Sequence, residues 1–179
     1  PSQFSYDSVA ASLGDVNRDG TCEVVAGDHS CFVNSWCPTG DAQGALWRQV
    51  TGNAGVCIGN STVALGDVNP LFDTNHIPDA VVGAAVTSCV WSFPGDCWRD
   101  YAEENPPYVC SAGWLMPTGT SVHSSPAVAD LDGDGHDDVA IGDDDGRLWI
   151  WSGATGEWAC YKVTNQPITS APAVAALDG

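Results

Sequence analysis

Short apolar runs separated by turn-forming residues make up most of the chain, and residues 124–163 show this pattern most clearly. The apolar runs there end in breaks rich in Asp, Gly and Ser, and they span residues 126–129, 139–142, 147–151 and 158–163. Turn signals about ten residues apart are typical of short β-strands, and no stretch has the period of an amphipathic helix. The pattern predicts an all-β fold whose unit is a sheet of four short antiparallel strands.

The same unit recurs along the chain. Residues 13–17 and 65–69 share the sequence LGDVN, and related stretches begin at residues 128 and 174. Their third positions are residues 15, 67, 130 and 176, which gives spacings of 52, 63 and 46 residues. Such spacings are typical of propeller repeats with four strands each. We therefore predict repeats over residues 1–60, 61–123 and 124–170, and the first strand of a fourth repeat over residues 171–179.

The first two repeats contain further predicted strands, at residues 24–27 and 32–36 and at residues 80–83 and 89–92. The second repeat also has a long tail over residues 96–123, which we interpret as a structured insertion.

Aromatic residues occur in two settings. Trp149 and Trp151 lie in a run that is apolar on both faces, and this predicts packing between adjacent sheets because aromatic rings bury large areas. Trp98, Tyr101 and Trp114 lie in the predicted insertion and are candidates for a surface contact.

An acidic loop follows the first predicted strand of the third repeat. It reads DLDGDGHDD over residues 130–138, which is the pattern D-x-D-x-D-G-x-x-D. Side-chain oxygens at positions one, three and five converge when the chain curls, glycine at six permits the turn, and an acid at nine closes the shell. Calcium prefers such hard oxygen ligands. The predicted ligands are Asp130, Asp132, Asp134, His136 through its backbone carbonyl, and Asp138.

The first and second repeats vary this loop. The first has Asn at position three and Glu at position nine, and its predicted ligands are Asp15, Asn17, Asp19, Thr21 and Glu23. The second has four extra residues between its second and third ligand positions. Its candidate ligands are Asp67, Asn69, Asp73, Asn75 and Asp79. Either Asp73 replaces a lost ligand or this loop no longer binds metal, and the sequence leaves both interpretations open.

Charge and cysteine content indicate the environment. Five Lys and Arg against 23 Asp and Glu give a formal charge of −18, which argues against nucleic acid and anionic membranes as partners. Eight cysteines without a C-x-x-C pair favour an oxidising compartment with up to four disulfides, including local Cys31–Cys37 and Cys89–Cys97 bridges, over eight buried free thiols. Asn60 begins a glycosylation sequon. Together these features predict an extracellular protein, secreted or at the cell surface.

No apolar run approaches the roughly 20 residues that span a bilayer. The chain opens on Pro1 and has a single Met, and we interpret it as a processed chain or an excerpt of a longer protein.

These residues resemble the FG-GAP repeat of integrin α subunits and of many secreted repeat proteins. Residues 4–11 are similar to the "FG" opening, residues 25–28, 82–85 and 141–144 occupy the "GAP" position, and residues 125–135 are a specific match. The resemblance implies a β-propeller, usually of seven blades, with calcium in the acidic loops. The stretched second loop, the extra cysteines and the insertion depart from the family pattern.

Three repeats are fewer than the roughly four to eight blades of a closed propeller. Either the rest of a longer propeller or other copies of the chain complete the ring, or the repeats stack in an open array. We expect such a partner to pack on the strand that contains Val174 and Leu177.

The sequence favours an extracellular calcium-stabilised module for adhesion, structural assembly or protein–protein interaction, with head-to-tail polymerisation as one form of assembly. A carbohydrate-binding propeller and a fragment of a propeller polysaccharide lyase or hydrolase are the alternatives. We expect no enzyme activity, because the calcium pattern accounts for most of the paired acids and neither G-x-S-x-G nor H-E-x-x-H occurs.

Overall fold

The computed structural model describes residues 10–16, 20–27, 32–36, 47–50, 61–68, 78–84, 89–93 and 114–175. Within these ranges there is no helix, and twelve strands form three antiparallel sheets of four strands each. The all-β fold class predicted from the sequence is confirmed. In chain order the strands are β1 (Ser12–Gly14), β2 (Glu23–Gly27), β3 (Phe32–Trp36), β4 (Trp47–Val50), β5 (Ala64–Gly66), β6 (Asp79–Ala84), β7 (Cys89–Phe93), β8 (Trp114–Pro117), β9 (Ala127–Ala129), β10 (Asp138–Gly142), β11 (Arg147–Trp151) and β12 (Trp158–Lys162).

Each sheet is a meander, because its strands pair in the order in which they follow one another along the chain. The third sheet shows how local turns produce this order. Asp143 to Gly146 form the tight connection between β10 and β11, in which the Gly146 N–H donates to the Asp143 carbonyl at 3.0 Å. Gly146 has a φ of 76°, a conformation that residues with a Cβ rarely adopt. The turn places Ile141 opposite Trp149 in the β10–β11 register.

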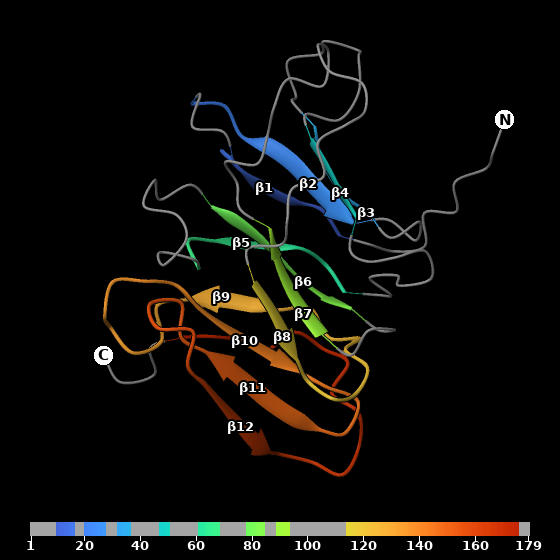
Figure 1. The fold of residues 1–179 in the computed structure, drawn as a ribbon. Helices are drawn as coiled ribbons and strands as arrows, with labels where there is room; N and C mark the ends of the chain where they lie inside the picture. Colours follow the sequence, from blue (N-terminus) through green and yellow to red (C-terminus); the bar gives the residue numbers. More distant parts are fainter. Residues whose placement is uncertain are drawn as a thin grey trace, which may run out of the picture.

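The three sheets lie one beside the next, as the blades of a propeller do (Figure 1). Their first strands are neighbours, with β1 packed beside β5 and β5 beside β9. Glycine at the end of a first strand permits this approach. A Cβ on Gly14 would lie 2.7 Å from Leu65 Cδ1 of the next sheet, and a Cβ on Gly66 would overlap the Val128 side chain.

The hydrophobic core lies between the sheets, and the middle sheet is buried on both faces. Ala80 and Val82 of β6 belong to the core cluster shared with the first sheet. Val81, between them, belongs to the cluster shared with the third sheet. Because successive side chains of a strand point to opposite faces, the middle of β6, which lies between two sheets, is apolar at three consecutive positions.

Trp149 and Trp151 belong to the second of these clusters and are 8% and 2% exposed. Their rings are stacked, with centroids 5.8 Å apart. The predicted packing of these residues between adjacent sheets is confirmed.

The four-stranded unit predicted for each repeat is complete in the structure, and it includes two fourth strands whose positions the sequence interpretation did not give, β4 and β8. β8 lies in the stretch of residues 96–123 that we interpreted as an insertion, yet it is the fourth strand of the second sheet. Neither strand has a strong alternation of its own, and each is fixed by its partner, β3 for β4 and β7 for β8. Strand formation at these edges therefore depends on pairing more than on local sequence.

After β12 the chain returns across the outer face of the third sheet. The Ile168 N–H donates to the Asp143 carbonyl at 3.0 Å, and a Cβ on Gly142 would lie 2.6 Å from Ile168 Cβ. One repeat earlier, Val122 packs in the same way on Gly83. The chain after β12 thus packs on the third sheet in the same way as the chain before β9 packs on the second sheet.

The first strand expected for a fourth repeat is not formed over residues 171–175. Val174 there is 43% exposed. A strand exists through its pairing, and the described part of the chain supplies no second strand at this position. Within the same ranges, no helix has the length and hydropathy of a membrane span.

Candidate metal centre

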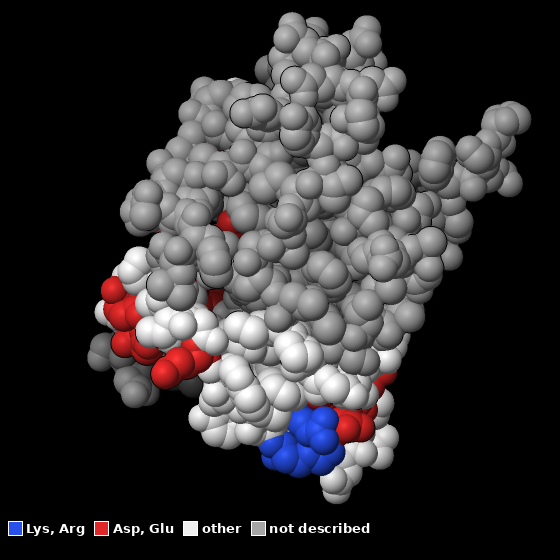
Figure 2. Space-filling model, in the orientation of Figure 1, with Lys and Arg blue, Asp and Glu red and all other residues white. Residues whose placement is uncertain are grey.

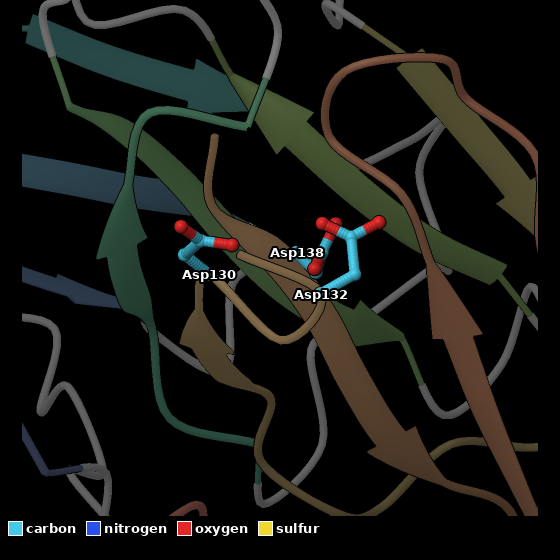
Figure 3. Close-up of side chains that lie close together, drawn as sticks. All are labelled: Asp130, Asp132 and Asp138. Atoms are coloured by element: carbon cyan, nitrogen blue, oxygen red, sulfur yellow. The ribbon is translucent and has the colours of Figure 1, made fainter. Parts of the chain in front are cut away.

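The acidic loop of the third sheet brings three carboxylates together. Asp130 directly follows β9 and Asp138 is the first residue of β10. Gly133 and Gly135 have φ values of 81° and 92° and let the chain between them curl tightly. Carboxylate oxygens of Asp130, Asp132 and Asp138 lie within 4.8 Å of one another. In Figure 3 one oxygen of Asp130 is turned towards the other two side chains.

Backbone amides hold Asp130 in this position. Its Oδ1 accepts the N–H groups of Gly133 at 2.7 Å and Asp134 at 3.1 Å, and its Oδ2 accepts that of Gly135 at 3.0 Å. Asp132 Oδ1 accepts the Asp134 N–H at 3.1 Å. Because these donors come from the loop itself, the nine-residue sequence is enough to order its first two acids.

Asp138 differs from the other two acids because it is buried, at 3% exposure. Its Oδ2 accepts the Leu131 N–H at 2.8 Å and its Oδ1 accepts the Gly153 N–H at 3.1 Å. The position-nine acid therefore closes the loop and fastens it to the connection between β11 and β12. Burial of a carboxylate is unfavourable unless it is paired, and these two amides supply that pairing.

The three acids fit a calcium ion. Calcium binds oxygen at about 2.3–2.6 Å, so two oxygens on one ion are at most about 5 Å apart. The separation within the cluster, 4.8 Å or less, meets this limit. Three carboxylates so close together also repel one another, and a divalent cation relieves the repulsion.

The two other predicted ligands of this loop lie outside the cluster. Asp134 Oδ1 accepts the His136 N–H at 2.9 Å, and both residues occupy the turn between Asp132 and Asp138. The roles proposed for the Asp134 carboxylate and the His136 carbonyl stay predictions.

The first loop repeats two of the hydrogen bonds of the third. The Gly20 N–H donates to Asp15 Oδ2 at 2.9 Å, five residues apart, as Gly135 does to Asp130. The Val16 N–H donates to Glu23 Oε2 at 3.0 Å, and Glu23 is fully buried. Thr21 is half-buried, whereas Asn17 and Asp19 lie outside the described residues. The frame of the predicted site is therefore present in the first sheet.

The second loop keeps the closing bond despite its extra length. The Val68 N–H donates to Asp79 Oδ2 at 3.2 Å across 11 residues, where the other two loops span seven. Asp79 is 1% exposed and Asp67 is half-buried. Asn69, Asp73 and Asn75 lie outside the described residues. The four added residues thus leave the base of the loop unchanged.

The sequence interpretation missed that the acid at position nine has a structural role as well as a predicted metal-binding one. We predicted it as a ligand in all three loops, but in each it also accepts the N–H of position two from a buried site. The signal was present in the sequence, because an acid directly before a strand of three or more apolar residues recurs at Glu23, Asp79 and Asp138.

Acidic side chains gather at the loop end of the third sheet, and the basic ones lie at its opposite end (Figure 2). There Arg147 and Lys162 are cross-strand partners. Arg147 forms an ion pair with Asp145 at 2.8 Å. Beneath it the buried Asp143 accepts the Trp149 indole N–H at 2.8 Å. These contacts hold the connection between β10 and β11, and we assign them a structural role.

Other predicted features fall partly outside the described residues. Asn60 and Leu177 lie there, as do Cys31, Cys37 and Cys97. Cys22 and Cys160, which the structure does describe, are free thiols. With eight cysteines in all and two of them free, six remain, so the predicted upper limit of four disulfides falls to three.

Comparison with known proteins identifies the repeat. The family model described as the FG-GAP repeat matches residues 124–151. The match contains β9, the acidic loop, β10 and β11. The resemblance stated from the sequence is confirmed for this FG-GAP repeat.

One solved structure supports the fold, and a second match is weaker. A chain in the crystal structure of BBS1N in complex with ARL6DN, soaked with lead, matches with a TM-score of 0.57 and 15% identity over 93% of this chain and 43% of that one. The present chain thus spans less than half the length of that chain. The crystal structure of the computationally designed Ika4 protein matches with a TM-score of 0.48 and 14% identity, over 93% and 81% of the two chains. No curated protein matches the sequence.

Proposed function

We propose that this chain is a calcium-stabilised propeller module of an extracellular protein and that it acts in protein–protein interaction. The observation that carries the proposal is the triad Asp130, Asp132 and Asp138, whose oxygens lie within 4.8 Å of one another inside the FG-GAP repeat. Asp15, Glu23, Asp67 and Asp79 form the frames of two further candidate sites.

Calcium has a structural role in this proposal. An ion bound only by the folded chain stabilises it by about 2.7 kcal/mol at a free concentration one hundred times Kd. Extracellular modules typically bind calcium with Kd of about 10⁻⁴ to 10⁻³ M, which suits an oxygen-rich loop on the protein surface. The role is non-catalytic, because the loop carboxylates are engaged by backbone amides that fix them around one point.

The partner is a protein surface, supplied by another copy of the chain or by the rest of a longer propeller. Exposed apolar side chains in β12 and in the chain after it support this part of the proposal. Tyr161, Val163 and Val174 are 56%, 61% and 43% exposed. Residue 174 corresponds to Val128 of β9, which packs against the core between the second and third sheets. Burial of Val174 by a neighbouring unit would repeat that contact.

The first test concerns the metal. Isothermal titration with calcium should detect binding by the native chain and the loss of one site in Asp132→Ala. Glu157→Ala is the matched control, because it also removes one exposed carboxylate but lies outside the acidic loops. Equal calcium binding by the native chain and Asp132→Ala would refute the assignment of the third loop.

The second test concerns assembly. Light scattering with and without calcium should show that the native chain associates in calcium, because bound ions reduce its formal charge of −18. A chain that ends at Thr169 lacks Val174 and should remain monomeric. A native chain that stays monomeric in saturating calcium would refute the assembly part of the proposal and leave the calcium part intact.

A further inference from the structure

Asp137 joins two acidic loops that lie 70 residues apart in the sequence. Its Oδ2 accepts the Asp67 N–H at 3.0 Å, and its own N–H donates to the Asp67 carbonyl at 3.3 Å. Asp67 is position one of the second loop, and Asp137 is position eight of the third. The pair therefore connects the start of one candidate metal loop to the end of the next.

Close packing leaves this connection little freedom. A Cβ on Gly66 would lie 2.9 Å from Asp137 Oδ2. On the other side, a Cβ on Gly153 would overlap the Asp137 carbonyl and lie 3.4 Å from Val68 Cα. Asp137 thus lies between two glycines at which a side chain would clash, and its two hydrogen bonds to Asp67 connect both its backbone and its side chain to the second sheet.

The neighbouring residue makes this contact relevant to metal binding. Asp138 belongs to the triad and also accepts the Gly153 N–H at 3.1 Å. An ion that fixes Asp138 restricts the backbone on either side of it, including that of Asp137. Position eight is Cys22 in the first loop and Pro78 in the second, so neither offers a carboxylate for the same bond.

We propose that Asp137 is a positioning residue that couples calcium binding in the third loop to the order of the second loop, across the junction of the two sheets. The inference rests on the proposed calcium site. Calcium in the third loop strengthens the bond from the Asp67 N–H, and by thermodynamic reciprocity that bond strengthens calcium binding in the third loop. The two loops then act as one unit at this junction.

The test uses hydrogen exchange of the Asp67 amide, followed by NMR with and without calcium. Calcium should slow this exchange about fivefold in the native chain, at the low end of the range of allosteric couplings. Asp137→Asn retains an acceptor oxygen and should preserve the effect, whereas Asp137→Ala should abolish it. Because both variants remove the same charge, their difference isolates the hydrogen bond. Calcium affinity should likewise be about fivefold lower in Asp137→Ala than in Asp137→Asn.

Asp132→Ala distinguishes coupling from direct binding. This variant should lose the calcium effect on the Asp67 amide, because its third loop no longer binds the ion. Persistence of the effect in Asp132→Ala would mean that calcium reaches Asp67 through the second loop, and it would overturn the coupling. Equal slowing in Asp137→Ala and the native chain would overturn it as well.

Titration calorimetry on the same samples separates this inference from the proposed function. A native chain that binds no calcium would refute both. Calcium binding lost in Asp132→Ala, but without an effect on the Asp67 amide of the native chain, would refute the coupling alone. The comparison of the native chain, Asp137→Asn and Asp132→Ala decides the matter even if Asp137→Ala does not fold.

Discussion

Replacement of Asp138 by alanine tests whether one side chain both binds the ion and holds the loop closed. Asp138 is 3% exposed and accepts the N–H groups of Leu131 and Gly153. The substitution removes both acceptors without adding a new one. We expect Asp138→Ala to lower stability even when calcium is absent.

The magnitude follows from those two hydrogen bonds. A buried donor left without an acceptor costs about 1–3 kcal/mol, so two donors give about 2–6 kcal/mol. Water can reach the loop side, where Leu131 is 37% exposed, and this favours a value near the lower end, about 3 kcal/mol. Domains of ordinary stability unfold with only about 5–15 kcal/mol. Asp138→Asn keeps one acceptor oxygen and should lie between alanine and the native chain.

Asp132→Ala is the matched comparison, because Asp132 belongs to the same triad but is exposed. In the loop Asp132 accepts the Asp134 N–H at the surface. In chelator its removal should leave stability unchanged or slightly higher, since one of three mutually repelling carboxylates is gone. In calcium, Asp132→Ala should lack the stabilisation of about 2.7 kcal/mol that the native chain gains at one hundred times Kd.

Urea unfolding in chelator and in calcium measures the stability of the native chain, Asp138→Ala, Asp138→Asn and Asp132→Ala. The free energy of unfolding is taken from its linear dependence on denaturant. If Asp138→Ala is as stable as the native chain in chelator, the closing role of position nine is wrong. If Asp138→Ala and Asp132→Ala lose equal stability in chelator, the distinction between a buried and an exposed ligand is wrong.

Three further predictions concern the core and the thiols. Gly83→Ala places a Cβ 2.5 Å from Val122 Cγ1 and should lower the free energy of unfolding by about 1–3 kcal/mol; an unchanged urea midpoint would contradict the packing. Trp151→Ala removes a side chain that is 2% exposed and should cost about 3–5 kcal/mol, seen as a lower thermal midpoint. Burial raises the pKa of the Cys160 thiol, so the folded state favours its protonated form. Stability should then fall as pH rises above about 8.5. Iodoacetamide at pH 8 should alkylate the exposed Cys22 faster than Cys160. Equal alkylation rates would refute the raised pKa of Cys160.

Features whose causes lie within a few residues could be predicted from the sequence. The apolar runs at β10 and β11 and the turn between them could be predicted because the strands are short runs of consecutive apolar residues and the turn has glycine at a tight connection. The acidic loop could be predicted for the same reason, since Asp130 and Asp132 are ordered by backbone amides of the loop itself.

Features that depend on distant partners became visible only in the folded chain. β4 and β8 exist because β3 and β7 pair with them. Asp79 closes the second loop across 11 residues, and Asp137 meets Asp67 across 70. No local pattern encodes such contacts, because pairing, burial and hydrogen bonding across a sheet junction arise only when the repeats pack side by side.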